Sequence, residues 1–242
     1  MNGFIFDNDG VIIDTERRLV DLNVQVCGEL GFIFDPALRS QFAGKPNQEG
    51  IFHLLKAHGQ EKNVSVQDYM MRRDVLLREW YAAPQFTPGF LSYFHGLLEE
   101  FPGVSVGIAS GTDEEFFEME DRYLGVMDLF QGNVALSNRD VRNHKPAPDI
   151  FIYAAALIGV SPQECAVWED SPLGIAAGYR AGVPRIIGYT RTLGAQLKAV
   201  AEEALGSDLR GKTGLREGQD IILIDAFDER LALDQTIRYL RR

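Results

Sequence analysis

Short apolar segments alternate with amphipathic segments along most of this chain of 242 residues. The apolar segments are continuous, which is typical of strands in a parallel sheet that is covered on both faces. We expect such strands at Gly3–Asp7, Val104–Ala109, Cys165–Glu169, Pro184–Ile187 and Ile221–Ile224. Between them, apolar residues recur with the period of a helix. The pattern predicts an α/β fold: a Rossmann-like parallel sheet with helices on both faces.

Residues 16–83 follow a different pattern, with much helical periodicity and no convincing strand. The segment Val66–Tyr81 is typical of a charged amphipathic helix. In an earlier helix, one face is expected to carry Val20, Val24, Cys27 and Gly31. We therefore expect two domains. Residues 1–15 and 84–242 form the Rossmann-like core, and residues 16–83 form a small all-helical domain inserted after the first strand.

Composition and charge narrow the range of partners. The formal net charge is −11 and the isoelectric point is about 4.9, which argues against nucleic acids and anionic membranes, because both are bound through basic patches. No apolar stretch approaches the roughly 20 residues that a membrane span needs. The N-terminus lacks the pattern of a secretory signal. The stretch Leu205–Gly218, rich in glycine and charge, is expected to be a surface loop.

The two cysteines, Cys27 and Cys165, lie far apart in the sequence and in apolar surroundings. Neither has the spacing of a metal ligand. We expect both to be buried free thiols, which fits a reducing cytoplasm.

The end of the first apolar segment carries the most informative chemistry. Asp7 and Asp9 are separated by one residue, and Gly10 follows them. Two carboxylates that are buried side by side are costly unless a cation neutralises them, and hard oxygen ligands of this kind suit Mg²⁺. The segment alone is also compatible with a strand followed by an acidic turn.

Three further segments place polar residues next to strands or helices. Ser110-Gly111 follows the second apolar segment, Lys145 precedes an expected helix start, and Glu169-Asp170 ends the third apolar segment. Each alone has a simpler interpretation, as a helix N-cap, a surface charge or an acidic helix cap. Because the carboxyl ends of parallel strands form the site edge of an open α/β sheet, Asp7, Ser110 and Asp170 are expected to converge there.

In this order, the four segments resemble the signatures of the haloacid dehalogenase-like hydrolase superfamily, in its capped phosphatase and β-phosphoglucomutase-like branch. The resemblance implies that residues 16–83 are a cap domain. It also implies phosphoryl transfer, with Asp7 as the nucleophile that becomes an aspartyl-phosphate and Asp9 as general acid and base. The implied ligands of Mg²⁺ are Asp7, Asp9, Asp170 and, through a water molecule, Glu169.

The expected contacts to substrate come from both domains. The expected substrate-binding residues are Asn8, Ser110, Gly111, Lys145, Lys45 and Gln48. Ser110 is expected to bind a phosphate oxygen, and Lys145 is expected to neutralise charge on the phosphate and on Asp7. Lys45 and Gln48 belong to a segment that resembles the loop facing the active site in capped relatives.

The favoured function is a cytoplasmic phosphatase that acts on a small phosphorylated metabolite, with a sugar phosphate preferred, as a monomer or small homo-oligomer. A mutase of the β-phosphoglucomutase type is the main alternative, but Gln48 stands where a mutase is expected to carry a basic cap residue. A phosphonatase would need a cap lysine, for which Lys45 is the candidate. A phosphate-ligand binding protein without turnover is the remaining alternative.

Overall fold

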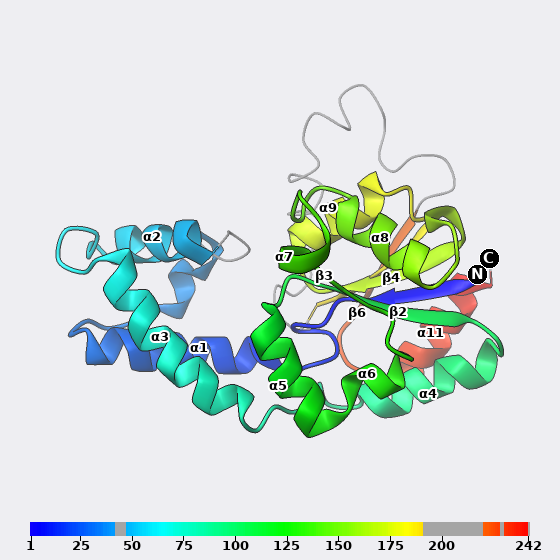
Figure 1. Ribbon diagram of the computed structural model, residues 1–242, viewed down its shortest axis with the longest axis horizontal. Coiled ribbons are helices and arrows are strands. Elements are labelled where there is room, and N and C mark those ends of the chain that lie inside the picture. The colour runs from blue at the N-terminus through cyan, green and yellow to red at the C-terminus, as the bar shows by residue number, and fades with distance from the viewer. Residues whose placement is uncertain (42–46, 191–219, 228–229, 242) are drawn as a thin grey trace. The chain divides into compact units, whose positions relative to one another are not determined.

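The computed structural model describes residues 1–41, 47–190, 220–227 and 230–241. Within them, a parallel sheet has the strand order β3-β2-β1-β4-β5-β6 (Figure 1). The strands are β1 (Gly3–Phe6), β2 (Ser105–Ser110), β3 (Val134–Leu136), β4 (Cys165–Glu169), β5 (Arg185–Tyr189) and β6 (Asp220–Ile224). The chain forms two compact units, Met1–Asp14 with Pro84–Arg242, and Thr15–Ala83. The sheet belongs to the first unit, so the predicted Rossmann-like α/β class is confirmed.

Helices cover both faces of the sheet. They are α4 (Phe90–Glu100), α5 (Glu114–Leu124), α6 (Val126–Leu129), α7 (Ser137–Asp140), α8 (Asp149–Leu157), α9 (Pro172–Arg180) and α11 (Arg230–Leu240), with a short 3₁₀ helix, η2, at Pro162–Glu164. In Figure 1, α8 and α9 lie on one side of the strands and α4 and α11 lie on the other. This arrangement explains why the strands are apolar on both faces.

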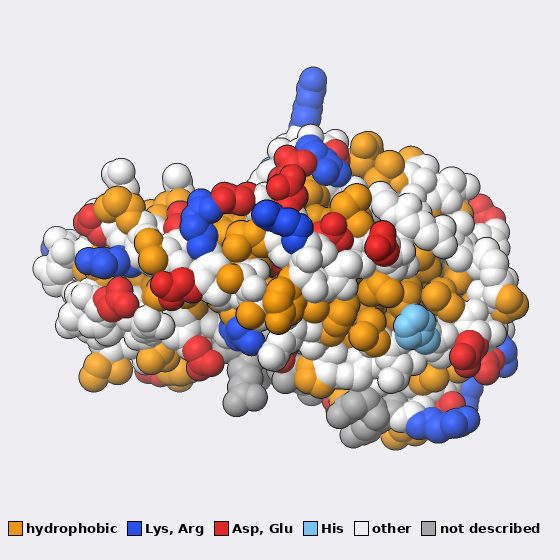
Figure 2. Space-filling view, turned by 60° about the horizontal axis from the view of Figure 1, so that its bottom comes forward, with side chains coloured by type: hydrophobic (Ala, Val, Ile, Leu, Met, Phe, Trp, Pro, Cys, Tyr) orange, Lys and Arg blue, Asp and Glu red, His pale blue; other side chains and the backbone are white. Residues whose placement is uncertain are grey.

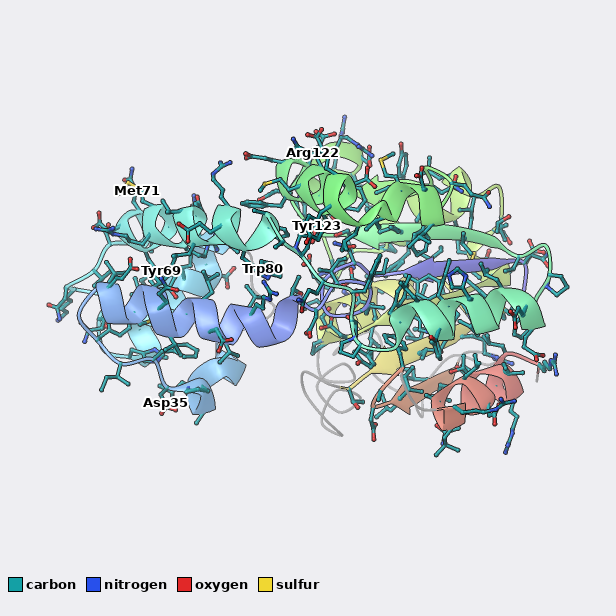
Figure 3. The ribbon with its side chains drawn as sticks, turned by 90° about the horizontal axis from the view of Figure 1, so that it is seen from below. Asp35, Tyr69, Met71, Trp80, Arg122 and Tyr123 are labelled. Atoms are coloured by element: carbon teal, nitrogen blue, oxygen red, sulfur yellow. The ribbon has the colours of Figure 1, made fainter. Side chains whose placement is uncertain are left out.

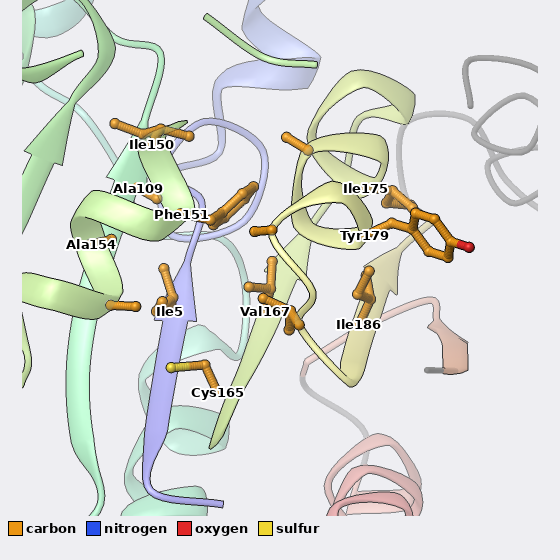
Figure 4. Packing of buried hydrophobic residues seen from close by; sticks show 14 of the residues in the cluster. Ile5, Ala109, Ile150, Phe151, Ala154, Cys165, Val167, Ile175, Tyr179 and Ile186 are labelled. Atoms are coloured by element: carbon orange, nitrogen blue, oxygen red, sulfur yellow. The ribbon is translucent and has the colours of Figure 1, made fainter. Parts of the chain in front are cut away.

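The face of the sheet that α8 and α9 cover is packed mainly with aliphatic side chains. Ile5 and Val167, on neighbouring strands, belong to one buried cluster with Ile150 and Phe151 of α8 and Ile175 of α9 (Figure 4). Small residues such as alanine let both helices approach the sheet closely. The free thiol of Cys165 is buried in this cluster, as predicted.

The opposite face is aromatic. Phe6 stacks on Trp168 with ring centroids 4.3 Å apart, and Phe90 and Phe94 of α4 meet Phe6 edge-on. The indole N–H of Trp168 donates to the Tyr93 hydroxyl at 2.9 Å, so this buried polar group is satisfied. Strand alternation therefore sends Ile5 to one core and Phe6 to the other.

The regular elements in the described part of the second unit are all helices. It contains α1 (Thr15–Glu29), the 3₁₀ helix η1 (Pro36–Gln41), α2 (Asn47–Ala57) and α3 (Val66–Tyr81). Tyr69 of α3 faces α1, where its hydroxyl donates to Asn23 at 2.6 Å, whereas Met71 of the same helix points outward (Figure 3). Cys27 is buried as a free thiol beside this contact, as predicted.

The face of α1 that carries Val20, Val24 and Cys27 is buried only in part. Val24 is 49% exposed, and the buried hydrophobic residues in the described part of this helix are Leu22, Val26 and Cys27. The periodicity was correct but its phase was shifted, because the partner helix α3 decides which stripe is covered.

The strand predictions hold within one or two residues, with one omission. We did not predict β3, which has only three residues and is too short to show a pattern of its own. Pairing with Ile108, Ala109 and Ser110 of β2 holds it in the sheet. The expected loop Leu205–Gly218 lies outside the described residues.

The surface is mixed in character. On the face shown in Figure 2, acidic and basic side chains are interspersed with hydrophobic ones. Among the helices described, none combines the length and the apolar character that crossing a membrane requires.

Candidate active site

The chain makes a tight loop directly after β1. This strand lies between β2 and β4, so the loop emerges near the middle of the sheet edge. The backbone amide of Asp7 still pairs with the Trp168 carbonyl oxygen at 2.9 Å. Gly10 then takes a left-handed conformation, with φ of 76°, which glycine adopts without strain. The loop thereby presents Asp7 and Asp9 at the carboxyl end of the strand, as the sequence predicted.

Lys145 bridges two buried carboxylates that come from different strands. Its Nζ lies 2.6 Å from Asp7 Oδ1 and 2.6 Å from Glu169 Oε1, and it donates to the Ala109 carbonyl oxygen at 3.0 Å. Asp7, Lys145 and Glu169 are thus brought together although Asp7 and Lys145 are 138 residues apart in sequence. Lys145 is not a solvated surface charge.

Asp170 completes an acidic cluster. Carboxylate oxygens of Asp7, Glu169 and Asp170 lie within 4.8 Å of one another, and all three residues are buried. Three carboxylates with one lysine leave excess negative charge in a buried place, and only oxygen donors are offered. This donor set fits a hard divalent cation such as Mg²⁺.

Burial and neighbouring charges shift the pKa values of Asp7 and Lys145. Burial raises the pKa of Asp7 well above its usual range, and the negative charges of Glu169 and Asp9 raise it further, against the opposing effect of Lys145. Burial acts to lower the pKa of Lys145, but the carboxylates of Asp7 and Glu169 outweigh it and raise that pKa overall. Lys145 therefore stays charged and supports the ionised form of Asp7.

Asp9 is reached by a short chain of hydroxyl groups. Ser110 donates to Thr112 Oγ1 at 2.7 Å, and the Thr112 backbone amide donates back to Ser110 Oγ at 2.9 Å. The Thr112 hydroxyl in turn donates to a carboxylate oxygen of Asp9. Ser110 is fully buried whereas Gly111 is exposed. The hydroxyl of Ser110 thus orients Thr112, and a direct contact between Ser110 and phosphate stays a prediction.

Several residues that support the site were not predicted. Ser171 binds Glu169 Oε2 through its backbone amide and its hydroxyl, both at 2.9 Å, and it caps α9 by accepting from the Gly174 amide at 3.0 Å. A Cβ atom at Gly174 would lie 1.7 Å from Glu169 Oε1, so no side chain fits there. Ser171-Pro172 was a readable N-cap signal. The signal for Thr112 was weaker: a hydroxyl residue two positions after Ser110.

The remaining predicted residues fall into two groups. Asn8 is fully buried, and its Nδ2 donates to Glu120 Oε2 of α5 at 2.7 Å. Gln48 is exposed near the start of α2 in the helical unit, and Lys45 lies outside the described residues. The substrate-binding roles of Asn8, Gln48 and Lys45 therefore stay predictions.

Comparisons with known proteins show what this chain is similar to. The chain is 27% identical over 226 residues to (DL)-glycerol-3-phosphatase 1, mitochondrial, of Arabidopsis thaliana, covering 89% of this chain and 74% of that protein. It is 28% identical over 187 residues to the fructose-1-phosphate phosphatase of Escherichia coli, covering 76% and 94%. A haloacid dehalogenase-like protein of Agrobacterium tumefaciens has a similar fold, with a TM-score of 0.75 at 21% identity over the whole of both chains.

The relatives from Arabidopsis thaliana and Escherichia coli are named as phosphatases, in keeping with the predicted class of enzyme. Residues 4–187, which contain all four motifs, match the family described as haloacid dehalogenase-like hydrolase. The chain therefore belongs to the haloacid dehalogenase-like hydrolase family, as its motifs predicted.

Proposed function

We propose that this protein is a Mg²⁺-dependent phosphatase that hydrolyses a small phosphorylated metabolite, with a sugar phosphate favoured, through an aspartyl-phosphate on Asp7. The observation that carries the proposal is the bridge from Lys145 to Asp7 and Glu169 beside Asp170. A charged lysine that holds one oxygen of a buried carboxylate orients that carboxylate for attack on phosphorus.

The proposed steps use the loop after β1 and the residues around it. Asp7 attacks phosphorus in line with the leaving oxygen, and Asp9 gives that oxygen a proton. Asp9 then takes a proton from the water that hydrolyses the aspartyl-phosphate. Thr112, which donates to Asp9, holds its carboxyl group in place for both transfers. Lys145 neutralises charge on Asp7 and on the phosphate.

The acidic cluster is the proposed place of the metal. Asp7 and Asp170 would hold Mg²⁺ directly, with Asp9 beside them. Both carboxylate oxygens of Glu169 have protein partners. Glu169 would therefore contact Mg²⁺ through a water molecule, and it would hold Lys145 in place through their ion pair. When bound, Mg²⁺ would offset the repulsion between the carboxylates and an anionic substrate.

The proposed substrate class rests on the relatives and on the helical unit. The two phosphatases named above carry glycerol 3-phosphate and fructose 1-phosphate in their names, so a small phosphorylated polyol or sugar is the class that fits. We propose that the unit Thr15–Ala83 is the cap, with Gln48 and Lys45 among the residues that select the substrate. The buried free thiols of Cys27 and Cys165 support a reducing, cytoplasmic location.

The test is phosphate release from a panel of phosphorylated metabolites in the presence of Mg²⁺, with Asp7→Asn as the blank. We expect release from one or a few sugar or polyol phosphates and none above background in Asp7→Asn. A variant that retains wild-type release would overturn the nucleophile assignment. Conversion of β-glucose 1-phosphate to glucose 6-phosphate without phosphate release would identify a mutase instead. Silence in both assays would favour a phosphonate substrate or a binding protein.

A further inference from the structure

A buried pair of polar side chains joins the loop after β1, which carries Asp7 and Asp9, to helix α5. Asn8 stands between Asp7 and Asp9, and its Nδ2 donates to Glu120 Oε2 at 2.7 Å. Both side chains have no exposed surface. A buried glutamate is uncommon, because the charged form is costly away from water. The burial of Glu120 beside this loop is therefore more consistent with a specific role than with chance placement.

Asn8 is also the backbone anchor of the loop. Its carbonyl oxygen accepts hydrogen bonds from the amides of Val11, Ile12 and Ile13, at 3.4, 2.9 and 3.0 Å. The chain thus folds back on Asn8 directly after the two catalytic carboxylates. Any shift of the Asn8 peptide moves Asp7 on one side and Asp9 on the other, since consecutive Cα atoms are rigidly spaced.

We propose that Glu120 is a positioning residue of this active site: through Asn8 it holds the loop that carries Asp7 and Asp9 against α5. The inference rests on the proposed function, because it concerns the orientation of the proposed nucleophile and general acid. Helix α5 is a suitable support. It begins directly after Ser110 and Thr112, and Thr112 donates a hydrogen bond to Asp9. The same part of the chain therefore contacts the loop at both Asn8 and Asp9.

The unpaired atoms of the pair indicate how Glu120 is held. Among the described residues, Asn8 Oδ1 and Glu120 Oε1 have no hydrogen-bond partner, and both would be acceptors if Glu120 were ionised. A neutral carboxyl group can face an amide with one hydrogen bond in each direction. In a neutral pair, Asn8 would donate to Glu120 Oε2 and a proton on Glu120 Oε1 would be donated to Asn8 Oδ1, which would satisfy both oxygens.

The electrostatic surroundings support the neutral form. Burial raises the pKa of Glu120 well above its usual range, and the charges of Asp9 and Asp7 act in the same direction, against the hydrogen bond from Asn8. A neutral side chain adds no negative charge to a site that already holds several carboxylates. Glutamine has the same shape as a neutral glutamic acid and can form the same two hydrogen bonds.

This equivalence defines the experiment. The variants Glu120→Gln and Glu120→Leu are compared with wild type for kcat on p-nitrophenyl phosphate with Mg²⁺ and, by calorimetry, for affinity for Mg²⁺ alone. We expect Glu120→Leu to lower kcat or Mg²⁺ affinity about 10–100-fold, as losses of groups behind an active site do. Glu120→Gln should stay close to wild type in both. Glu118→Gln, an exposed change on the same helix, is the matched control.

A double-mutant cycle separates positioning from general support of the fold. Asn8→Ser removes the pair from the loop side and places no apolar group in the core, so it also serves if Glu120→Leu does not fold. If Glu120 acts through Asn8, removing it from Asn8→Ser protein should reduce kcat little further. Independent, multiplying losses would overturn the proposal, as would a Glu120→Gln variant as impaired as Asn8→Ser.

The two readouts also separate this inference from the proposed function. If wild-type protein shows no turnover of any phosphate ester, the proposed function fails. A Mg²⁺ affinity that is weakened in Glu120→Leu and kept in Glu120→Gln would still support the positioning role. Normal kcat and normal Mg²⁺ affinity in Glu120→Leu would refute the positioning role, whatever the substrate.

Discussion

Replacing Lys145 with methionine tests the electrostatic balance of the site. Methionine keeps much of the length of the side chain but loses the Nζ that lies 5.1 Å from the Phe151 ring centroid. It removes the cation that lies 2.6 Å from both Asp7 and Glu169. Two buried carboxylates then face each other and Asp170 with no positive charge between them.

The expected cost is large in the absence of metal. Breaking a buried ion pair by removing one partner costs about 3–5 kcal/mol. For a chain of this size, each kcal/mol shifts the melting temperature by roughly 2–4 °C, so we expect a fall of roughly 6–20 °C in EDTA. Mg²⁺ should recover more stability in the variant than in wild type, because a more negative cluster attracts the cation more strongly. Turnover should fall to the level of Asp7→Asn.

The assay is thermal and denaturant unfolding in EDTA and in Mg²⁺, with Lys56→Met as the control at an exposed lysine of α2. The control should change stability by less than about 0.5 kcal/mol. A Lys145→Met protein that unfolds within about 1 kcal/mol of wild type in EDTA, with no extra gain from Mg²⁺, would refute the reasoning. That result would mean that the two carboxylates do not depend on Lys145 for their charge balance.

Three other changes test separate parts of the site. Asp9→Asn should slow hydrolysis of alkyl phosphates more than that of p-nitrophenyl phosphate, because an aryl oxide leaves without a proton; equal losses in kcat on both would argue against a general acid. Gly174→Ala should lower the melting temperature and kcat, because the new Cβ would overlap Glu169. Gly178→Ala in the same helix should be tolerated, because its Cβ would meet only ordinary contacts of 3.5 Å and longer. Equal effects of the two variants would contradict the packing argument. The pKa of Asp7 is raised in the folded state, so the stability that its carboxyl group contributes is complete below the unfolded pKa of about 3.9 and is lost as pH rises through the folded pKa. In EDTA, the unfolding free energy of wild type should therefore fall relative to that of Asp7→Asn as pH rises above about 4. No change in this difference with pH, or a change in the opposite direction, would show that the pKa is not raised.

The fold could be predicted wherever one segment carried its own pattern. Val66–Tyr81 was predicted with the observed bounds because a charged stripe and an apolar stripe alternate through it. The strand Val134–Leu136 was missed because three residues hold no period, and its pairing with β2 is a long-range event. The burial of Leu22 and Val26 in place of Val24 was also decided by packing, since an amphipathic period does not say which stripe meets the neighbouring helix.

For the candidate active site, the sequence by itself determined which residues are proposed to carry the chemistry. Asp7, Asp9 and Asp170 could be found because each stands where an apolar strand ends, and chain order alone places such ends at one edge of a parallel sheet. Lys145 has no such local signal and was found from the joint pattern of the four motifs.

Only the tertiary structure decided what supports those residues. Glu169 turned out to be held by Ser171 and Lys145, and Asn8 by Glu120, a residue 112 positions away on a helix with no motif. The reason is physical. A strand end and its carboxylate are local features of the chain, but the partner of a buried polar group is whichever donor or acceptor the packed core brings within about 3 Å of it.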